Sequence, residues 1–249
     1  MEILTVIILL SGGLFAGVLN TIVGGGSLIS VPLLIASGLP VHLAVGTNRF
    51  AMVFNTGVGA IDYHKKIKYD TKLALFLASF ASVGSYLGAN IVLQIDERIL
   101  EYIIGILMLS LGGVILYKKK LGLEEKKIDL TKRNYLVIIV LNFLLGIYGG
   151  FFGGGISTMF TFVFVSYFGK NFIKSAGITR FIVCILSMIA VISFTLNNNI
   201  DFSYGIILAI TFVAGAKIGV KLALKAGNVW MRRLFVILAI ISSIKLFFF

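Results

Sequence analysis

Long apolar runs are the feature that most constrains how this chain can fold. Five stretches of about 20 residues carry few or no charges, and each is long enough to cross a hydrocarbon core of about 30 Å. Hydrophobic residues make up 59% of the chain, against about 45–50% in soluble domains. The sequence therefore predicts an all-α polytopic membrane protein, whose clearest apolar runs are Ile3 to Val23, Leu73 to Leu93, Ile99 to Tyr117, Phe202 to Val220 and Val229 to Ile244.

The net charge of +12 does not indicate a nucleic-acid-binding protein. Most lysines and arginines fall in short segments between the apolar runs, as in the cytoplasmic loops of membrane proteins. The sequence contains no basic groove pattern with interleaved aromatic residues. The two histidines, His42 and His64, have no partner at metal-ligand spacing, so we expect no metal site. We also expect no cofactor and no nucleic-acid partner, and only membrane lipid around the apolar runs.

The chain divides into two similar halves at a hydrophilic linker. This linker, residues 118–134, is rich in lysine and separates a first transmembrane repeat, 1–117, from a second, 135–249. Matching residues lie 129 apart up to the glycine triplets and 131 apart after them, so the second half carries a two-residue insertion. The matches pair Gly17 with Gly146, Gly24–Gly26 with Gly153–Gly155, Gly46 with Gly177, Arg49 with Arg180, Asp70 with Asp201, Gly84 with Gly215 and Gly88 with Gly219.

The distribution of charge orients the two halves relative to the membrane. Loop 62–72 holds four lysines, whereas its counterpart 196–202 holds none. The next loop shows the reverse, because 94–98 has one basic residue and its counterpart 225–233 has three. Corresponding loops therefore lie on opposite faces under the positive-inside rule, which predicts an inverted-topology repeat of the kind found in many secondary transporters. We expect the linker inside and both termini outside.

Each half is predicted to contain about five helical segments. The second segment of each half follows a glycine triplet and is too short to span comfortably. A glycine-broken or re-entrant helix pair fits there, because lipid-exposed irregular backbone is not tolerated; whether these short helices span or re-enter stays open. The expected segments are 3–23, 27–37, 41–62, 72–93 and 98–117, then 135–152, 155–169, 174–196, 202–224 and 229–248.

Two matched arginines, Arg49 and Arg180, are the strongest candidates for a functional site. Each lies inside a long apolar region, where an ionisable residue is costly and commonly marks a substrate path. Arg49 lies about 12 Å into its predicted helix, so reaching an interface by snorkelling is the alternative explanation. A pair of buried cations predicts an anionic substrate, and the planar guanidinium can donate two parallel hydrogen bonds to an oxyanion. The neighbouring Asn48 and Thr179 favour a polar cavity.

The matched glycine triplets are the second candidate element. Glycine allows a sharp turn and a close approach of the backbone to a ligand, and a helix that begins there presents N–H groups and a partial positive charge. The alternative is that these glycines only allow close helix packing. Hydroxyl groups of Ser27, Ser157 and Thr158 could add donors. The predicted substrate-binding residues are Gly24, Gly25, Gly26, Ser27, Asn48, Arg49, Gly153, Gly154, Gly155, Ser157, Thr179 and Arg180.

These motifs resemble the TauE/SafE sulfite exporter family. The resemblance rests on the two glycine triplets, on Gly46-Thr47-Asn48-Arg49 and on Gly149-x-x-x-Gly153, and it covers essentially the whole chain. The family pattern often has lysine where this chain has Arg49 and Arg180, a departure that keeps the charge. The resemblance implies a plasma-membrane transporter of a prokaryote that moves small sulfur-containing anions such as sulfite, thiosulfate or sulfonates.

The sequence thus favours a secondary transporter for a small sulfur-containing oxyanion that works by alternating access. A passive anion channel is one alternative. A membrane-embedded enzyme is a weaker one, because no nucleophile, carboxylate pair or metal cluster lies within an apolar run. All ten acidic residues lie in loops or near segment ends, which disfavours cation transport. The substrate, coupling ion and direction stay open, as does the oligomeric state, for which a homodimer is one candidate.

Overall fold

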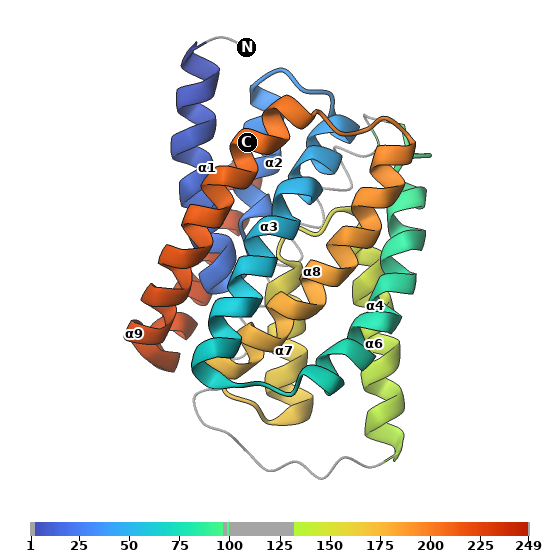
Figure 1. The fold of residues 1–249 in the computed structure, drawn as a ribbon, viewed down its shortest axis with the longest axis vertical. Coiled ribbons are helices and arrows are strands. Elements are labelled where there is room, and N and C mark those ends of the chain that lie inside the picture. Colours follow the sequence, from blue (N-terminus) through green and yellow to red (C-terminus); the bar gives the residue numbers. More distant parts are fainter. Residues whose placement is uncertain (1–2, 97–98, 100–131, 249) are drawn as a thin grey trace.

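The structure is a computed structural model that describes residues 3–96, 99 and 132–248, and this part of the chain is entirely helical (Figure 1). The prediction of an all-α protein is confirmed. The expected segment 98–117 and most of the linker 118–134 lie outside the described residues. The helices are α1 (Ile3–Val23), α2 (Ser27–Ala36), α3 (Val41–Ile67), α4 (Thr71–Val92), α6 (Lys132–Phe151), α7 (Ile156–Phe168), α8 (Phe172–Leu196) and α9 (Phe202–Phe248).

Four helical segments in the described part of the chain are long and apolar enough to cross a membrane: Thr5–Val23, Thr71–Val92, Phe172–Leu196 and Phe202–Gly227. The outer surface fits such surroundings, because large apolar side chains such as Ile61, Leu75 and Ile210 are exposed there. In water that exposure would be unfavourable, whereas hydrocarbon solvates it without cost. The chain is therefore a multi-pass membrane protein.

The first two helices of each half form a broken hairpin. Figure 1 shows that α2 returns toward the end of the bundle at which α1 begins, and that α7 returns toward the end at which α6 begins. We call the end where α1 begins the upper end and the end where α6 begins the lower end, as in the figure. The two hairpins thus enter the bundle from opposite ends and turn back inside it, with α2 and α7 as their returning helices.

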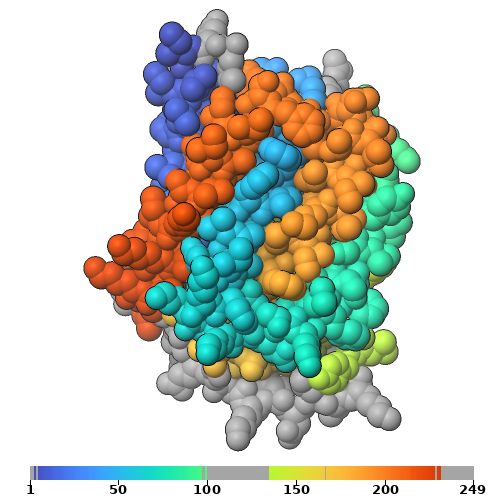
Figure 2. All heavy atoms as spheres, viewed as in Figure 1, coloured from blue at the N-terminus to red at the C-terminus, as the bar shows by residue number. Residues whose placement is uncertain are grey.

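Helix α3 lies at the centre of the fold. It packs against both α8 and α9, and Figure 2 shows it between these two helices on the face in view. It runs from the upper to the lower end, whereas its predicted counterpart α8 runs from the lower to the upper end (Figure 1). This opposite direction supports the inverted repeat, although the equivalence of the complete halves remains a prediction.

Helix ends follow the capping residues that the sequence supplies. The side chain of Asp70 accepts hydrogen bonds from the backbone N–H groups of Lys72 and Leu73 at 3.0 and 3.1 Å. Asp201 accepts equivalent bonds from Ser203 and Tyr204 at 2.9 and 3.1 Å. Both matched aspartates therefore act as N-caps, which satisfy donors that the first helical turn leaves free.

Several helix boundaries differ from those expected. Helix α8 begins at Phe172 and not at residue 174, because Asn171 caps it by accepting from the Lys174 N–H at 2.9 Å. Helix α3 continues to Ile67, five residues past the expected end, and closes at Lys68 in a left-handed conformation. Helix α6 starts at Lys132, so the last three residues assigned to the linker form its first turn. The final two expected segments meet at Gly227, whose φ of 74° and ψ of 178° interrupt α9.

Glycines pack the first helix of each half against the fourth helix of the other half. A side chain on Gly146 of α6 would collide with the backbone of Ala81 in α4, and one on Gly17 of α1 would meet the Cα of Phe212 in α9 at 3.0 Å. These contacts correspond residue for residue, since Ala81 and Phe212 lie 131 apart. The glycines therefore do allow close helix approach at these positions, in a pattern that repeats between the halves.

Candidate functional site

The glycine triplets that interrupt the two hairpins, Gly24–Gly26 and Gly153–Gly155, lie close to each other inside the bundle, and we call them the glycine breaks. The hydroxyl group of Thr158, at the start of α7, donates to the backbone carbonyl of Val23 at the end of α1, with an Oγ1–O distance of 2.6 Å. A Cβ atom on Gly24 would lie 2.5 Å from the Cβ of Ser157. Gly24 itself has a φ of 95°, a conformation that glycine adopts far more easily than other residues.

The breaks lie inside the helix bundle. Helix α2 has 10 residues and α7 has 13, so at 1.5 Å per residue they are about 15 and 20 Å long. Since the N-termini of α2 and α7 meet there, the contact between the two halves brings two interrupted helices together, an arrangement in which transporters commonly bind substrate.

Arg49 is fully buried at this contact. Its side chain is 0% exposed, and its guanidinium group lies where a side chain on Gly153 would have to be. Among the described residues, none forms a hydrogen bond with its Nε, Nη1 or Nη2 atom. The hydroxyl group of Tyr148 is its electrostatic neighbour, and that hydroxyl donates to the Gly154 carbonyl at 2.5 Å. Arg49 thus holds a desolvated positive charge next to the second glycine break, and it does not snorkel to an interface.

Arg180 approaches the same break from α8. It is 1% exposed, and its Nη1 atom donates to the Ser157 hydroxyl at 2.9 Å. Its Nε atom has no hydrogen-bond partner within the described part of the chain. Tyr63 of α3 is its electrostatic neighbour. Both arginines therefore lie at or next to the α6–α7 break, Arg49 against Gly153 and Arg180 against Ser157 in the first turn of α7, an asymmetry that the matched sequence positions do not reveal.

The polar residues predicted beside the arginines are engaged elsewhere. Asn48 donates to the Ser27 hydroxyl at 3.0 Å and accepts from the Ser30 hydroxyl at 2.5 Å, so it ties α3 to α2. Thr179 accepts a hydrogen bond from Thr161 of α7 at 3.4 Å. These contacts give Asn48 and Thr179 a role in fixing the short helices. Their role as direct substrate ligands remains a prediction.

Backbone donors at the breaks are also partly used. The N–H groups of Ile156 and Thr158 bond to the carbonyls of Gly153 and Gly155 at 3.2 and 2.9 Å. In the first half, the Gly26 N–H donates to the Asn20 side chain at 3.4 Å. The expected anion cradle of free N–H groups is therefore smaller than the glycine pattern indicates.

A second polar cluster lies between α1, α3 and α9. The Asn55 amide nitrogen donates to the carbonyls of Gly17 and Phe212 at 3.0 and 2.9 Å, and its oxygen accepts from Asn20 and Thr21 at 2.6 and 3.2 Å. Asn55 is thus a fully bonded helix–helix contact.

Asn20 and Tyr148 were missing from the predicted site. Asn20 lies four residues before Gly24 and Tyr148 five before Gly153, so polar residues one turn upstream of each triplet were the available signal.

Known proteins resemble this chain over nearly its whole length. The family described as sulfite exporter TauE/SafE matches residues 9–246. This chain belongs to the TauE/SafE family. Among its relatives, a protein of Haemophilus influenzae named "probable membrane transporter protein" is 27% identical over 96% of this chain and 93% of the relative. The YfcA protein of Escherichia coli K12, which carries the same description, is 27% identical over 94% of this chain and 87% of its own length.

These relatives extend across both halves, so the TauE/SafE assignment covers both glycine breaks and both arginines. A further relative from Sinorhizobium, also named a "probable membrane transporter protein", is 25% identical over 93% of this chain and 88% of its own. No solved structure shows a significant match. The names of the family and its relatives indicate membrane transport and not enzymatic activity.

Proposed function

We propose that this chain is a secondary transporter that carries a small sulfur-containing oxyanion across the plasma membrane of a prokaryote. The observation that carries the proposal is the buried guanidinium group of Arg49, which has no hydrogen-bond partner among the described residues and lies against the glycine break of the opposite half. The family supplies the class of substrate, since it is described as a sulfite exporter family.

The energetics favour an anion at this position. A buried charge without a partner costs several kcal/mol in desolvation, and neighbouring tyrosine hydroxyls are dipoles that offset only part of that cost. An oxyanion next to Arg49 and Arg180 would supply the missing hydrogen bonds and the opposite charge. Guanidinium groups suit this geometry, because their planar fork donates two parallel bonds to oxyanions such as carboxylate or phosphate.

The arrangement of the halves supports alternating access. The two breaks belong to hairpins that enter from opposite ends of the bundle, and they touch through Thr158 and Val23. A ligand at this contact would be reached from one end or the other as the halves rock against each other. In this proposal the linker faces the cytoplasm and both termini lie outside, as the distribution of lysines indicates.

A proteoliposome assay tests the transport proposal. The purified protein is reconstituted and offered labelled sulfite, thiosulfate, sulfate and a short sulfonate, with and without a proton or sodium gradient. A carrier should show saturable uptake and counterflow of at least one of these anions. Uptake that rises linearly with concentration and lacks counterflow would identify a passive channel, and absence of flux for the whole panel in both directions would overturn the proposed substrate class.

A further inference from the structure

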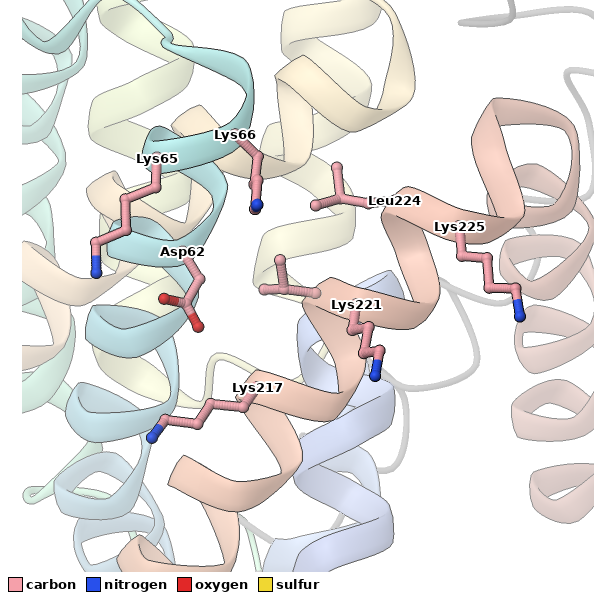
Figure 3. Close-up of a pocket in the computed structure, with 8 residues that line it drawn as sticks. Asp62, Lys65, Lys66, Lys217, Lys221, Leu224 and Lys225 are labelled. Atoms are coloured by element: carbon pink, nitrogen blue, oxygen red, sulfur yellow. The ribbon is translucent and has the colours of Figure 1, made fainter.

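A second, basic pocket lies at the lower end of the bundle, and neither arginine is among its lining residues. It has a volume of about 520 Å³ and is formed by the last turns of α3 and the middle of α9. Figure 3 shows Asp62, Lys65 and Lys66 on α3, with the side chain of Lys217 extending from α9 toward α3. Lys221 and Lys225 follow along α9. The pocket therefore joins a helix of the first half to a helix of the second.

The charge of this pocket is strongly unbalanced. Five lysines and one aspartate line it, which leaves an excess of four positive charges. Lysines 217, 221 and 225 recur at intervals of four residues, so they form one row along α9. In a soluble protein, water would solvate such a cluster of lysines, whereas here the same helix also faces lipid. A ligand that carries negative charge would relieve the mutual repulsion of the lysines.

The depth of the lysines matches the headgroup region of a bilayer. Counted from Phe202 at the upper end, Lys217 lies about 22 Å along α9 and Lys225 about 34 Å. A hydrocarbon core is about 30 Å thick, so this row crosses the boundary between acyl chains and headgroups. The long lysine side chains can hold their amines at that boundary while their stems remain in apolar surroundings.

Apolar groups continue the pocket toward the membrane. Val220 and Leu224 line it between the lysines. Large exposed apolar side chains also occur on both helices at positions next to the pocket residues in sequence, namely Ile61, Ile218 and Leu222. A soluble anion would use only the amines, whereas a molecule with a charged head and apolar chains would contact both surfaces. This juxtaposition favours a lipid.

We propose that this pocket binds the phosphate headgroup of an anionic phospholipid, with the acyl chains lying against α3 and α9. Basic pockets between membrane helices are a recognised setting for such headgroups. A lipid bound there would bridge the two halves of the protein at the end where α3 meets α9. The proposal does not depend on which anion is transported, and its test requires no transported substrate.

Native mass spectrometry of the purified full-length chain tests this proposal directly. Phosphatidylglycerol, phosphatidylcholine with the same acyl chains, and soluble glycerol phosphate are titrated separately. The double variant K217Q/K221Q removes two pocket lysines. The matched control K68Q/K72Q removes two lysines from the nearby turn, outside the pocket. Each lysine near an anionic headgroup contributes about a fivefold factor in affinity, so the pocket variant should bind phosphatidylglycerol about 30-fold more weakly.

The control variant should change phosphatidylglycerol affinity less than about threefold, and phosphatidylcholine should not saturate either protein. Equal losses in both double variants would mean diffuse surface attraction and would overturn the pocket. Binding of glycerol phosphate as tight as that of the lipid would overturn the assignment to a membrane lipid. Unchanged phosphatidylglycerol affinity in K217Q/K221Q would likewise overturn the lipid site.

Discussion

The guanidinium group of Arg49 occupies the space that a side chain on Gly153 would need. The two residues come from opposite halves of the chain, and Gly153 has a φ of 68°. Glycine is therefore required here for two reasons, the backbone conformation and the room for a buried cation. This contact couples the conformation of the α6–α7 break to the position of the charge that we assign to anion binding.

Replacing Gly153 with alanine should disrupt transport more than replacing Gly25. A Cβ atom on Gly153 collides with Arg49, and a left-handed conformation costs a non-glycine residue about 1–2 kcal/mol. A Cβ atom on Gly25 would lie 3.7 Å from its nearest neighbour, the Cδ1 atom of Leu28. We expect G153A to lose at least about tenfold in substrate affinity, equivalent to about 1.4 kcal/mol, and G25A to lose less, because its Cβ meets no close neighbour. Concentration-dependent uptake at matched membrane levels measures both, and equal behaviour of the two variants would contradict the coupling.

Neutralising either arginine should weaken anion binding. A hydrogen bond to a charged group contributes about 1.5–3 kcal/mol, so R49Q and R180Q should each lose about 10- to 150-fold in affinity. R49K should be milder, because it keeps the charge and loses the bidentate fork. Calorimetry on the purified variants gives the affinities. If R49Q and R180Q both bind substrate as the wild type does, the central site is wrong.

Arg49→Gln should have the opposite effect on stability. Without substrate, the buried guanidinium has no hydrogen-bond partner among the described residues, so its removal relieves a desolvation cost. The melting temperature of substrate-free R49Q should therefore rise above that of the wild type, as at other sites where function is maintained against stability. At the same concentration, a bound anion should raise the melting temperature of the wild type more than that of R49Q, since the variant binds it more weakly. A substrate-free R49Q that melts well below the wild type would mean that Arg49 has a structural role.

The sequence predicted the burial of the arginines and the positions of the glycine breaks, because both depend on local signals. A charge within an apolar run and a triplet of glycines can both be recognised in the sequence before the fold is known. The boundary between α3 and α4 was predicted in part, since the expected segment 72–93 lies within one residue of the observed helix at both ends. These features repeat between halves, which made them stand out from a chain that contains 28 glycines.

The direction of the side chains was not predictable in the same way. Asn48 neighbours Arg49 in sequence but faces Ser27, since successive residues on a helix point about 100° apart. The convergence of both arginines on the second break depends on how α3 and α8 pack. Tyr148 enters the site only because α6 lies against Arg49 of the other half. These roles depend on contacts between segments that are distant in the sequence, and a single sequence does not reveal such contacts.

The matched glycines Gly84 and Gly215 should respond alike to substitution. A Cβ atom on Gly84 would collide with the Phe143 carbonyl, and one on Gly215 would lie 2.7 Å from the Val18 nitrogen. Overpacking of this kind costs about 1–3 kcal/mol, so G84A and G215A should each lower the melting temperature. G57A is the control, because its Cβ would meet only the Cys184 sulfur at 3.4 Å. A destabilised G84A beside an unaffected G215A would contradict equivalent packing in the two halves.

The last prediction concerns orientation in the membrane. The connection between α3 and α4 lies at the lower end, and the connection between α8 and α9 lies at the upper end (Figure 1); Lys72 is at the start of α4 and Asn197 directly follows α8. The loop with Lys72 is rich in lysine and the loop with Asn197 has none, so the positive-inside rule places them in the cytoplasm and outside, respectively. Cys184 is the single cysteine and is buried, so a C184A background allows one reporter at a time.

In that background, N197C should react with a membrane-impermeant maleimide in intact cells, whereas K72C should react only after permeabilisation. Both side chains are exposed in the structure, so failure to label cannot be attributed to burial within the protein. Labelling of K72C alone in intact cells would reverse the orientation and place both termini inside. Labelling of both from the same face would contradict the inverted repeat, because the counterpart loops of two inverted halves must lie on opposite sides of the membrane.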